Sequence, residues 1–183
     1  MNYIVLDLEA TCWKDRNTNK QNEIIEIGAL KIDNEGEVES EFSEFVKPKL
    51  NPQLSGFCLE LTTIKQSEID SADTYDIVIN RFKEWIDTTQ EFVLCSWGFY
   101  DKKQFAKDCD LYGLEKSWLE NHVSLKHQYA NIKNLRKPLG MGRALKKEGL
   151  KLNGTHHRGI DDARNIARIF MSNFDNWKIN NRV

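Results

Sequence analysis

The feature that most constrains this chain is the apolar run Tyr3-Ile4-Val5-Leu6, which ends directly on Asp7-Leu8-Glu9. An apolar run without polar alternation is typical of a strand buried on both faces of a sheet. A strand directs alternate side chains to opposite faces, so Asp7 and Glu9 are expected side by side on one face. Buried neighbouring carboxylates repel each other, and each is costly to desolvate unless it is paired or binds a metal. The sequence therefore predicts a central strand that ends at a divalent-metal site.

Length and composition fit a single domain over residues 1–183, with enough chain for a substantial core. Hydrophobic residues make up 40% and charged residues 30%, the balance of an ordinary soluble protein. No segment is long and apolar enough to cross a membrane, and a cytoplasmic location is expected. Neither a disulfide framework nor a thiolate zinc site is expected, because the cysteines are widely separated and form no CxxC pair. They are Cys12, Cys58, Cys95 and Cys109.

The net charge of -2 hides two oppositely charged segments. Residues 33–44 hold six acidic residues and no Lys or Arg, and their alternation with apolar residues predicts one solvated strand face. Residues 126–158 hold nine basic residues and one acid. Arg143, Lys146 and Lys147 share a predicted helix in this segment. Their charge suits a phosphate backbone, and a solvated helix face explains the same pattern.

Hydrophobic periodicity predicts an α/β domain with a mixed sheet, because an antiparallel meander is followed by alternating helices and strands. The expected strands are residues 1–9, 23–32, 38–46, 92–97 and 122–125. The expected helices are residues 72–86, 101–112, a short one that follows residues 139–142 and ends at 148, and 160–174. Loops are expected over 48–56 and, near the site, over 14–22. Gly140 and Gly142 lack the third glycine and the preceding parallel strand of a dinucleotide site, so they mark the start of a helix.

Two further carboxylates, Asp101 and Asp162, begin predicted helices. Capping is the ordinary explanation, because Asp101 with Gln104 matches a capping box and acids in a first turn favour the helix dipole. Both also lie where ligands gather in α/β folds, beyond the carboxyl ends of strands. They are therefore candidates to complete the site that Asp7 and Glu9 begin.

Two adjacent histidines, His156 and His157, shortly precede Asp162. A neutral imidazole beside the carboxylates suits a general base near neutral pH, and either histidine fits that role. Zinc binding by the pair is not expected, because adjacent side chains rarely converge on one ion and no third His or Cys lies nearby.

Three segments together resemble the exonuclease motifs of the DEDDh superfamily. They are Asp7-Leu8-Glu9-Ala10-Thr11, Ser96-Trp97-Gly98-Phe99-Tyr100-Asp101 and His157-Arg158-Gly159-Ile160-Asp161-Asp162-Ala163-Arg164-Asn165. With residues 54–62 the resemblance covers nearly the whole chain. It is strongest to the subgroup of 3′–5′ exoribonucleases that trim histone mRNA and ribosomal RNA ends and are linked to RNA interference. The resemblance implies an RNase H-like fold with a five-stranded mixed sheet flanked by helices.

The resemblance also implies that Asp7, Glu9, Asp101 and Asp162 hold two Mg²⁺ or Mn²⁺ ions and that His157 is the base. Hard cations of this kind prefer oxygen ligands. The family spacing between histidine and the last aspartate pairs His157 with Asp162, whereas a start from His156 would select Asp161. The implied reaction is two-metal hydrolysis from the 3′ end, which releases nucleoside 5′-monophosphates.

For the substrate, the resemblance implies that Phe57 and Tyr100 sandwich the terminal base, with Leu61 in the same contact surface. Backbone N–H groups around Ala10 and Thr11 are expected to read the sugar hydroxyls. Aromatic stacking is how proteins hold single-stranded nucleic acid. Burial in the core is the ordinary alternative for Phe57.

The leading hypothesis is a metal-dependent exoribonuclease that acts on single-stranded RNA 3′ ends or overhangs. A DNA-directed exonuclease of the proofreading or repair type is the alternative within the class, because contacts to the 2′-hydroxyl distinguish the two substrates. A catalytically silent RNA-binding or partner-recruiting module is the alternative of another class. It predicts the loss of a ligand or of the base, and the sequence retains all of them.

Overall fold

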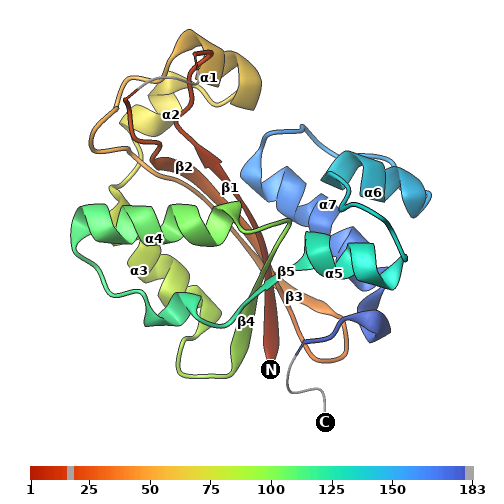
Figure 1. The fold of residues 1–183 in the computed structure, drawn as a ribbon. Coiled ribbons are helices and arrows are strands. Elements are labelled where there is room, and N and C mark those ends of the chain that lie inside the picture. The colour runs from red at the N-terminus through yellow and green to blue at the C-terminus, as the bar shows by residue number, and fades with distance from the viewer. Residues whose placement is uncertain (16–18, 180–183) are drawn as a thin grey trace.

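The computed structural model describes residues 1–15 and 19–179. Their strands form one five-stranded sheet in the order β3-β2-β1-β4-β5 (Figure 1). The strands are β1 (Asn2–Ala10), β2 (Ile24–Ile32), β3 (Val38–Phe45), β4 (Phe92–Ser96) and β5 (His122–Ser124). β1 pairs antiparallel with β2 and parallel with β4, so the sheet is mixed. The apolar run of β1 makes it the central strand, as expected.

Helices cover both faces of the sheet, as Figure 1 shows. α3 (Tyr75–Ile86) and α4 (Tyr100–Tyr112) pack on one face through an aromatic core around Phe82 and Phe105. α5 (Leu125–Ile132), α6 (Met141–Lys147) and α7 (Gly159–Met171) pack on the other face. α7 buries Ala163, Ile166 and Phe170, which form one stripe at helical spacing. Because the sheet is enclosed on both sides, its functional groups gather at the strand ends.

Three helices were not expected from the sequence. α1 (Gly56–Thr62) and α2 (Gln66–Asp70) follow the expected loop, and α5 begins directly after β5. α1 is too short to show a helical stripe and starts where the Ser55 side chain accepts a hydrogen bond from the Cys58 N–H at 3.0 Å. α3 begins at Tyr75 instead of residue 72, and α7 ends at Met171 instead of 174. Short helices are set by caps and tertiary contacts, which periodicity does not reveal.

The charged segments also differ in detail from expectation. Glu41 of β3 is exposed, whereas Glu44 faces α3 and makes a two-pronged ion pair with Arg81. α6 begins after Gly140, which confirms that these glycines start a helix. The loop expected over 14–22 includes residues 16–18, which lie outside the described residues. Among the helices that the structure describes, none has the length and apolar character needed to cross a bilayer.

Candidate active site

Four carboxylates from three elements line one cavity of about 250 Å³ at the ends of β1 and β4. Asp7 and Glu9 come from β1, Asp101 from α4 and Asp162 from α7. Oxygen atoms of Asp7, Glu9 and Asp162 lie within 4.8 Å of one another. The Asp101 carboxylate accepts the Leu8 N–H at 3.2 Å, which places it beside the β1 pair. The structure therefore brings together all four of the predicted metal ligands.

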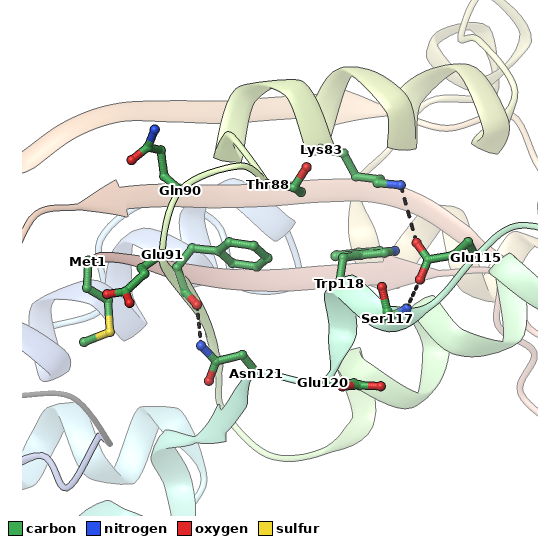
Figure 2. A pocket seen from close by; sticks show the side chains of 11 residues that line it. Met1, Lys83, Thr88, Gln90, Glu91, Glu115, Ser117, Trp118, Glu120 and Asn121 are labelled. Carbon is green, nitrogen blue, oxygen red and sulfur yellow. Dashed lines mark hydrogen bonds and ion pairs between the residues drawn. The ribbon is translucent and has the colours of Figure 1, made fainter.

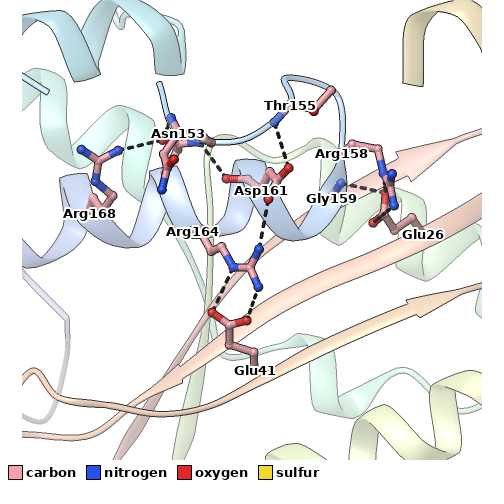
Figure 3. Close-up of polar contacts among 10 residues, drawn as sticks. Glu26, Glu41, Asn153, Thr155, Arg158, Gly159, Asp161, Arg164 and Arg168 are labelled. Atoms are coloured by element: carbon pink, nitrogen blue, oxygen red, sulfur yellow. Dashed lines mark hydrogen bonds and ion pairs between the residues drawn. The ribbon is translucent and has the colours of Figure 1, made fainter. Parts of the chain in front are cut away.

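The position of Asp162 depends on a close approach of α7 to the sheet. Gly159 begins α7 directly over Gly28 of β2, which pairs with Asp7 in the sheet. The buried carboxylate of Glu26 accepts the Gly159 N–H at 2.9 Å and pairs with Arg158 at 3.2 Å (Figure 3). Sequence reasoning missed Glu26, although an acid within the apolar strand Ile24-Ile25-Glu26-Ile27 is itself a sign of a buried contact.

Asp161 and Asp162 point to different sides of α7. The Asp161 carboxylate accepts the Thr155 N–H at 2.8 Å and pairs with Arg164 at 3.1 Å, so it holds the preceding loop (Figure 3). Asp162 faces the cavity instead. This geometry favours Asp162 over Asp161 as the candidate ligand.

Asp101 reaches the cavity from the turn between β4 and α4. The expected capping box with Gln104 is wrong, because Phe99 is the N-cap and Asp101 is already inside the helix. The Gln104 amide donates to the Asn22 carbonyl at 2.8 Å instead of to the helix start. The Asp101 carboxylate thus lines the site, and Gln104 takes no part in capping α4.

The electrostatics of the cavity favour the binding of cations. Burial raises the pKa of Asp7 well above its ordinary value, and repulsion from Asp101 and Glu9 adds to the shift. Burial, with repulsion from Asp162, raises the pKa of Glu9 to about 8. Burial raises the pKa of Asp101 to about 6, and hydrogen bonds from Ser96 and from its own and the Leu8 backbone oppose the shift. A site of crowded carboxylate oxygens matches the donors that Mg²⁺ and Mn²⁺ prefer.

The two histidines differ from expectation in one respect. Their rings stack with centroids 4.0 Å apart, and both offer ligand atoms close to Asp162, so adjacent histidines do converge here. His156 Nδ1 lies 2.9 Å from an Asp162 oxygen, while His157 contacts Asp162 through its backbone N–H at 3.0 Å. His157 has a left-handed backbone, with φ 65°. Burial and the neighbouring His156 lower the pKa of His157, which favours the neutral imidazole that a base requires.

The predicted substrate residues are not all gathered at the cavity. Tyr100 lines it and is 53% exposed. Phe57, on α1, is 38% exposed, so it is not an ordinary core residue; Leu61 is half-buried on the same helix. Ala10 and Thr11 are buried. The expectation for the Thr11 N–H is wrong, because it donates to the Glu23 carbonyl at 2.8 Å and extends the β1–β2 pairing.

A larger cavity, of about 560 Å³, lies at the opposite end of the sheet, where β1 and β4 begin (Figure 2). Trp118, Lys83 and Glu115 line it, and Lys83 pairs loosely with Glu115 at 3.9 Å. It contains none of the candidate ligands. Size therefore does not identify the site, whereas the converging carboxylates do.

A mixed sheet whose central strand carries two acids, completed by acids at the starts of two helices, defines the RNase H-like fold of the DEDDh nucleases. The chain matches the exonuclease family RNase_T over residues 4–170 and belongs to that family. This confirms the expected fold and family.

Three comparisons refine that placement. The chain is 33% identical to human ERI1 exoribonuclease 2, over 90% of this chain and 27% of the relative. Among solved structures, it resembles the nuclease domain of 3′hExo, a DEDDh family member bound to rAMP, with a TM-score of 0.92 at 28% identity, covering 100% of this chain and 97% of that one. A structure of histone mRNA stem-loop recognition by 3′-exonuclease gives a TM-score of 0.90 at 27% identity, covering 97% and 83%. The chain spans between about a quarter and a half of the length of the curated relatives that it matches.

Proposed function

We propose that this chain is a metal-dependent 3′–5′ exoribonuclease that trims single-stranded RNA 3′ ends or overhangs and releases nucleoside 5′-monophosphates. The observation that carries the proposal is the convergence of Asp7, Glu9, Asp101 and Asp162 in one cavity of an exonuclease-family fold. The similarity to 3′hExo bound to rAMP supports RNA as the substrate. The DNA-directed alternative shares the same site and differs only in its contacts to the sugar.

Asp7, Glu9 and Asp162 would hold one divalent ion, and Asp7 and Asp101 a second. Mg²⁺ and Mn²⁺ both suit this donor set. When bound, such ions neutralise the phosphodiester charge and align the attacking and leaving oxygens. The carboxylates orient that arrangement, and His157 takes a proton from the attacking water. Tyr100 and Phe57 hold the terminal base by stacking.

The test uses purified protein with 5′-labelled single-stranded RNA, single-stranded DNA of the same sequence, and an RNA stem-loop with a 3′ tail. The expected result is a ladder that shortens stepwise from the 3′ end of RNA, with Mn²⁺ or Mg²⁺ and not with EDTA. Faster degradation of the DNA would favour the DNA-directed alternative. Internal cleavage, or activity that persists in EDTA, would contradict the mechanism.

Asp7→Asn and Asp161→Asn form a matched pair of variants for this test. Asp7→Asn removes a candidate ligand at nearly constant volume and is expected to abolish activity. Asp161→Asn changes a neighbouring carboxylate that faces away from the cavity. Binding of RNA without hydrolysis by the unmodified protein would support the silent module instead.

A further inference from the structure

The turn between β4 and α4 delivers two candidate functional groups, Tyr100 and Asp101. β4 ends at Ser96, and α4 begins at Tyr100. Gly98, with φ 142°, makes the turn between them. Because Asp101 is the second residue of α4, a small change in this turn would displace its carboxylate from the other three carboxylates of the site.

Ser96 is fully buried at the base of this turn, and its hydroxyl contacts two polar groups. Ser96 Oγ lies 2.9 Å from His122 Nε2 and 3.2 Å from the Gly98 carbonyl. The hydroxyl hydrogen therefore has two acceptors within hydrogen-bond distance, His122 Nε2 and the Gly98 carbonyl oxygen. The His122 tautomer decides between them.

The other nitrogen of His122 indicates the tautomer. Nδ1 is buried and has no hydrogen-bond partner within residues 1–15 and 19–179. An orphaned buried N–H is rarer in proteins than an orphaned acceptor, so Nδ1 carries the lone pair. Nε2 then carries the hydrogen and donates it to Ser96 Oγ. The Ser96 hydroxyl consequently donates to the Gly98 carbonyl oxygen in the turn that leads to Asp101.

The surroundings hold the His122 ring in this orientation. Phe99 packs against His122 at 5.9 Å between ring centroids and stacks on His127 at 5.0 Å. The Ser124 hydroxyl lies 2.7 Å from His127 Nδ1, which anchors that second ring. Burial, with the nearby Lys102 charge, lowers the pKa of His122 to about 4, so the ring is neutral near neutral pH.

We propose that His122 is a positioning residue for the nuclease site: by donating to Ser96, it directs the Ser96 hydroxyl hydrogen to the 98–101 turn and thereby holds Asp101 in place. The inference rests on the proposed function. His122 lies on β5 and does not line the carboxylate cavity, so it acts only through Ser96. Groups that orient metal ligands in this way typically affect metal affinity or activity by about 10–100-fold.

Four variants test the hydrogen-bonded path from His122 through Ser96 to the turn, which is called the relay. Ser96→Ala and His122→Phe remove it, while Ser96→Thr keeps the hydroxyl and His122→Gln keeps an N–H donor. Mn²⁺ binding without RNA is titrated first, and then kcat and KM are measured on single-stranded RNA. Ser96→Ala and His122→Phe are expected to weaken Mn²⁺ binding and lower kcat by about 10–100-fold, with KM nearly unchanged. Ser96→Thr and His122→Gln are expected to retain most of both. The double variant is expected to match Ser96→Ala alone, because the two side chains act in series.

Circular dichroism melts separate this effect from unfolding. If His122→Phe does not fold, the Ser96→Ala and Ser96→Thr pair decides the question. Wild-type Mn²⁺ binding and kcat in folded His122→Phe or Ser96→Ala would overturn the proposal, as would equal defects in His122→Phe and His122→Gln. If the unmodified protein shows no nuclease activity on any substrate, the proposed function is contradicted. Weaker Mn²⁺ binding in Ser96→Ala and His122→Phe would still support the positioning role of His122.

Discussion

Gly28 of β2 and Gly159 of α7 approach so closely that position 28 has no room for a side chain. A Cβ added to Gly28 would lie 2.2 Å from the Gly159 carbonyl carbon, which is backbone and cannot move aside alone. This contact sets where α7 begins and hence where Asp162 enters the cavity.

Gly28→Ala is therefore expected to push α7 from the sheet. Overpacking of this kind typically costs about 1–3 kcal/mol of unfolding free energy. A displacement of Asp162 by about 1 Å is expected to lower activity by about 100-fold. Urea unfolding and RNA degradation assays measure the two effects. Gly142→Ala is the matched control, because a Cβ at Gly142 meets nothing within 4 Å, and equal behaviour of the two variants would contradict the argument.

The raised carboxyl pKa values predict how stability depends on pH in the metal-free protein. The pKa of Glu9 rises from 4.5 to about 8 on folding, so the native state holds more protons than the unfolded chain between these values. The free energy of unfolding is then highest below about pH 4.5 with respect to this group and falls as pH rises towards 8. Asp7 acts in the same direction. Saturating Mn²⁺ binds the ionised carboxylates and is expected to cancel or reverse this fall.

Urea unfolding in EDTA and in Mn²⁺, at several pH values between about 5 and 8, measures this linkage. Glu9→Gln, which cannot ionise, is expected to show a shallower fall in EDTA. Stability that increases with pH in EDTA would show that the carboxylates are not destabilising one another.

The two histidines give a prediction in which the choice of substitution matters. Because His157 has a left-handed backbone, Asn replaces it with less strain than Ala. His157→Asn is expected to lower kcat by about 100- to 10,000-fold, the usual range for a general base, while Mn²⁺ and RNA binding persist. His156→Asn is expected to retain kcat and to bind Mn²⁺ more tightly. In the metal-free protein the His156 ring contacts an Asp162 oxygen, and this contact competes with the metal for that oxygen. The reverse pattern would make His156 the base.

Local sequence patterns were sufficient for the central part of this site and insufficient for its periphery. Asp7 and Glu9 share a face because strand geometry alone requires it. The choice of Asp162 over Asp161 depends on the rotation of α7, which the distant contact between Gly28 and Gly159 sets.

Long-range pairing explains the errors as well. The Thr11 N–H is used by Glu23, twelve residues away, so no short motif reveals that it is engaged. α1 was missed because its seven residues are stabilised by the Ser55 cap and by burial of Cys58, and not by a periodic stripe. His122 has no motif at all, and its contact with Ser96 follows only from the parallel pairing of β4 with β5.

Two exposed aromatic residues, Tyr100 in the cavity lining and Phe57 on α1, yield a last prediction. Tyr100 and Phe57 remain 53% and 38% exposed, which leaves ring surface for a base. Stacking contributes about 1–3 kcal/mol per base, so Tyr100→Ala and Phe57→Ala are each expected to raise KM for RNA by about 5- to 150-fold. Ile77→Ala is the control, because Ile77 is 44% exposed on α3, away from the carboxylates. Equilibrium binding of RNA in Ca²⁺, measured by fluorescence anisotropy, should weaken in step with KM. A change in kcat without a change in RNA binding would instead mean that Tyr100 acts by orienting Asp101, its neighbour on α4.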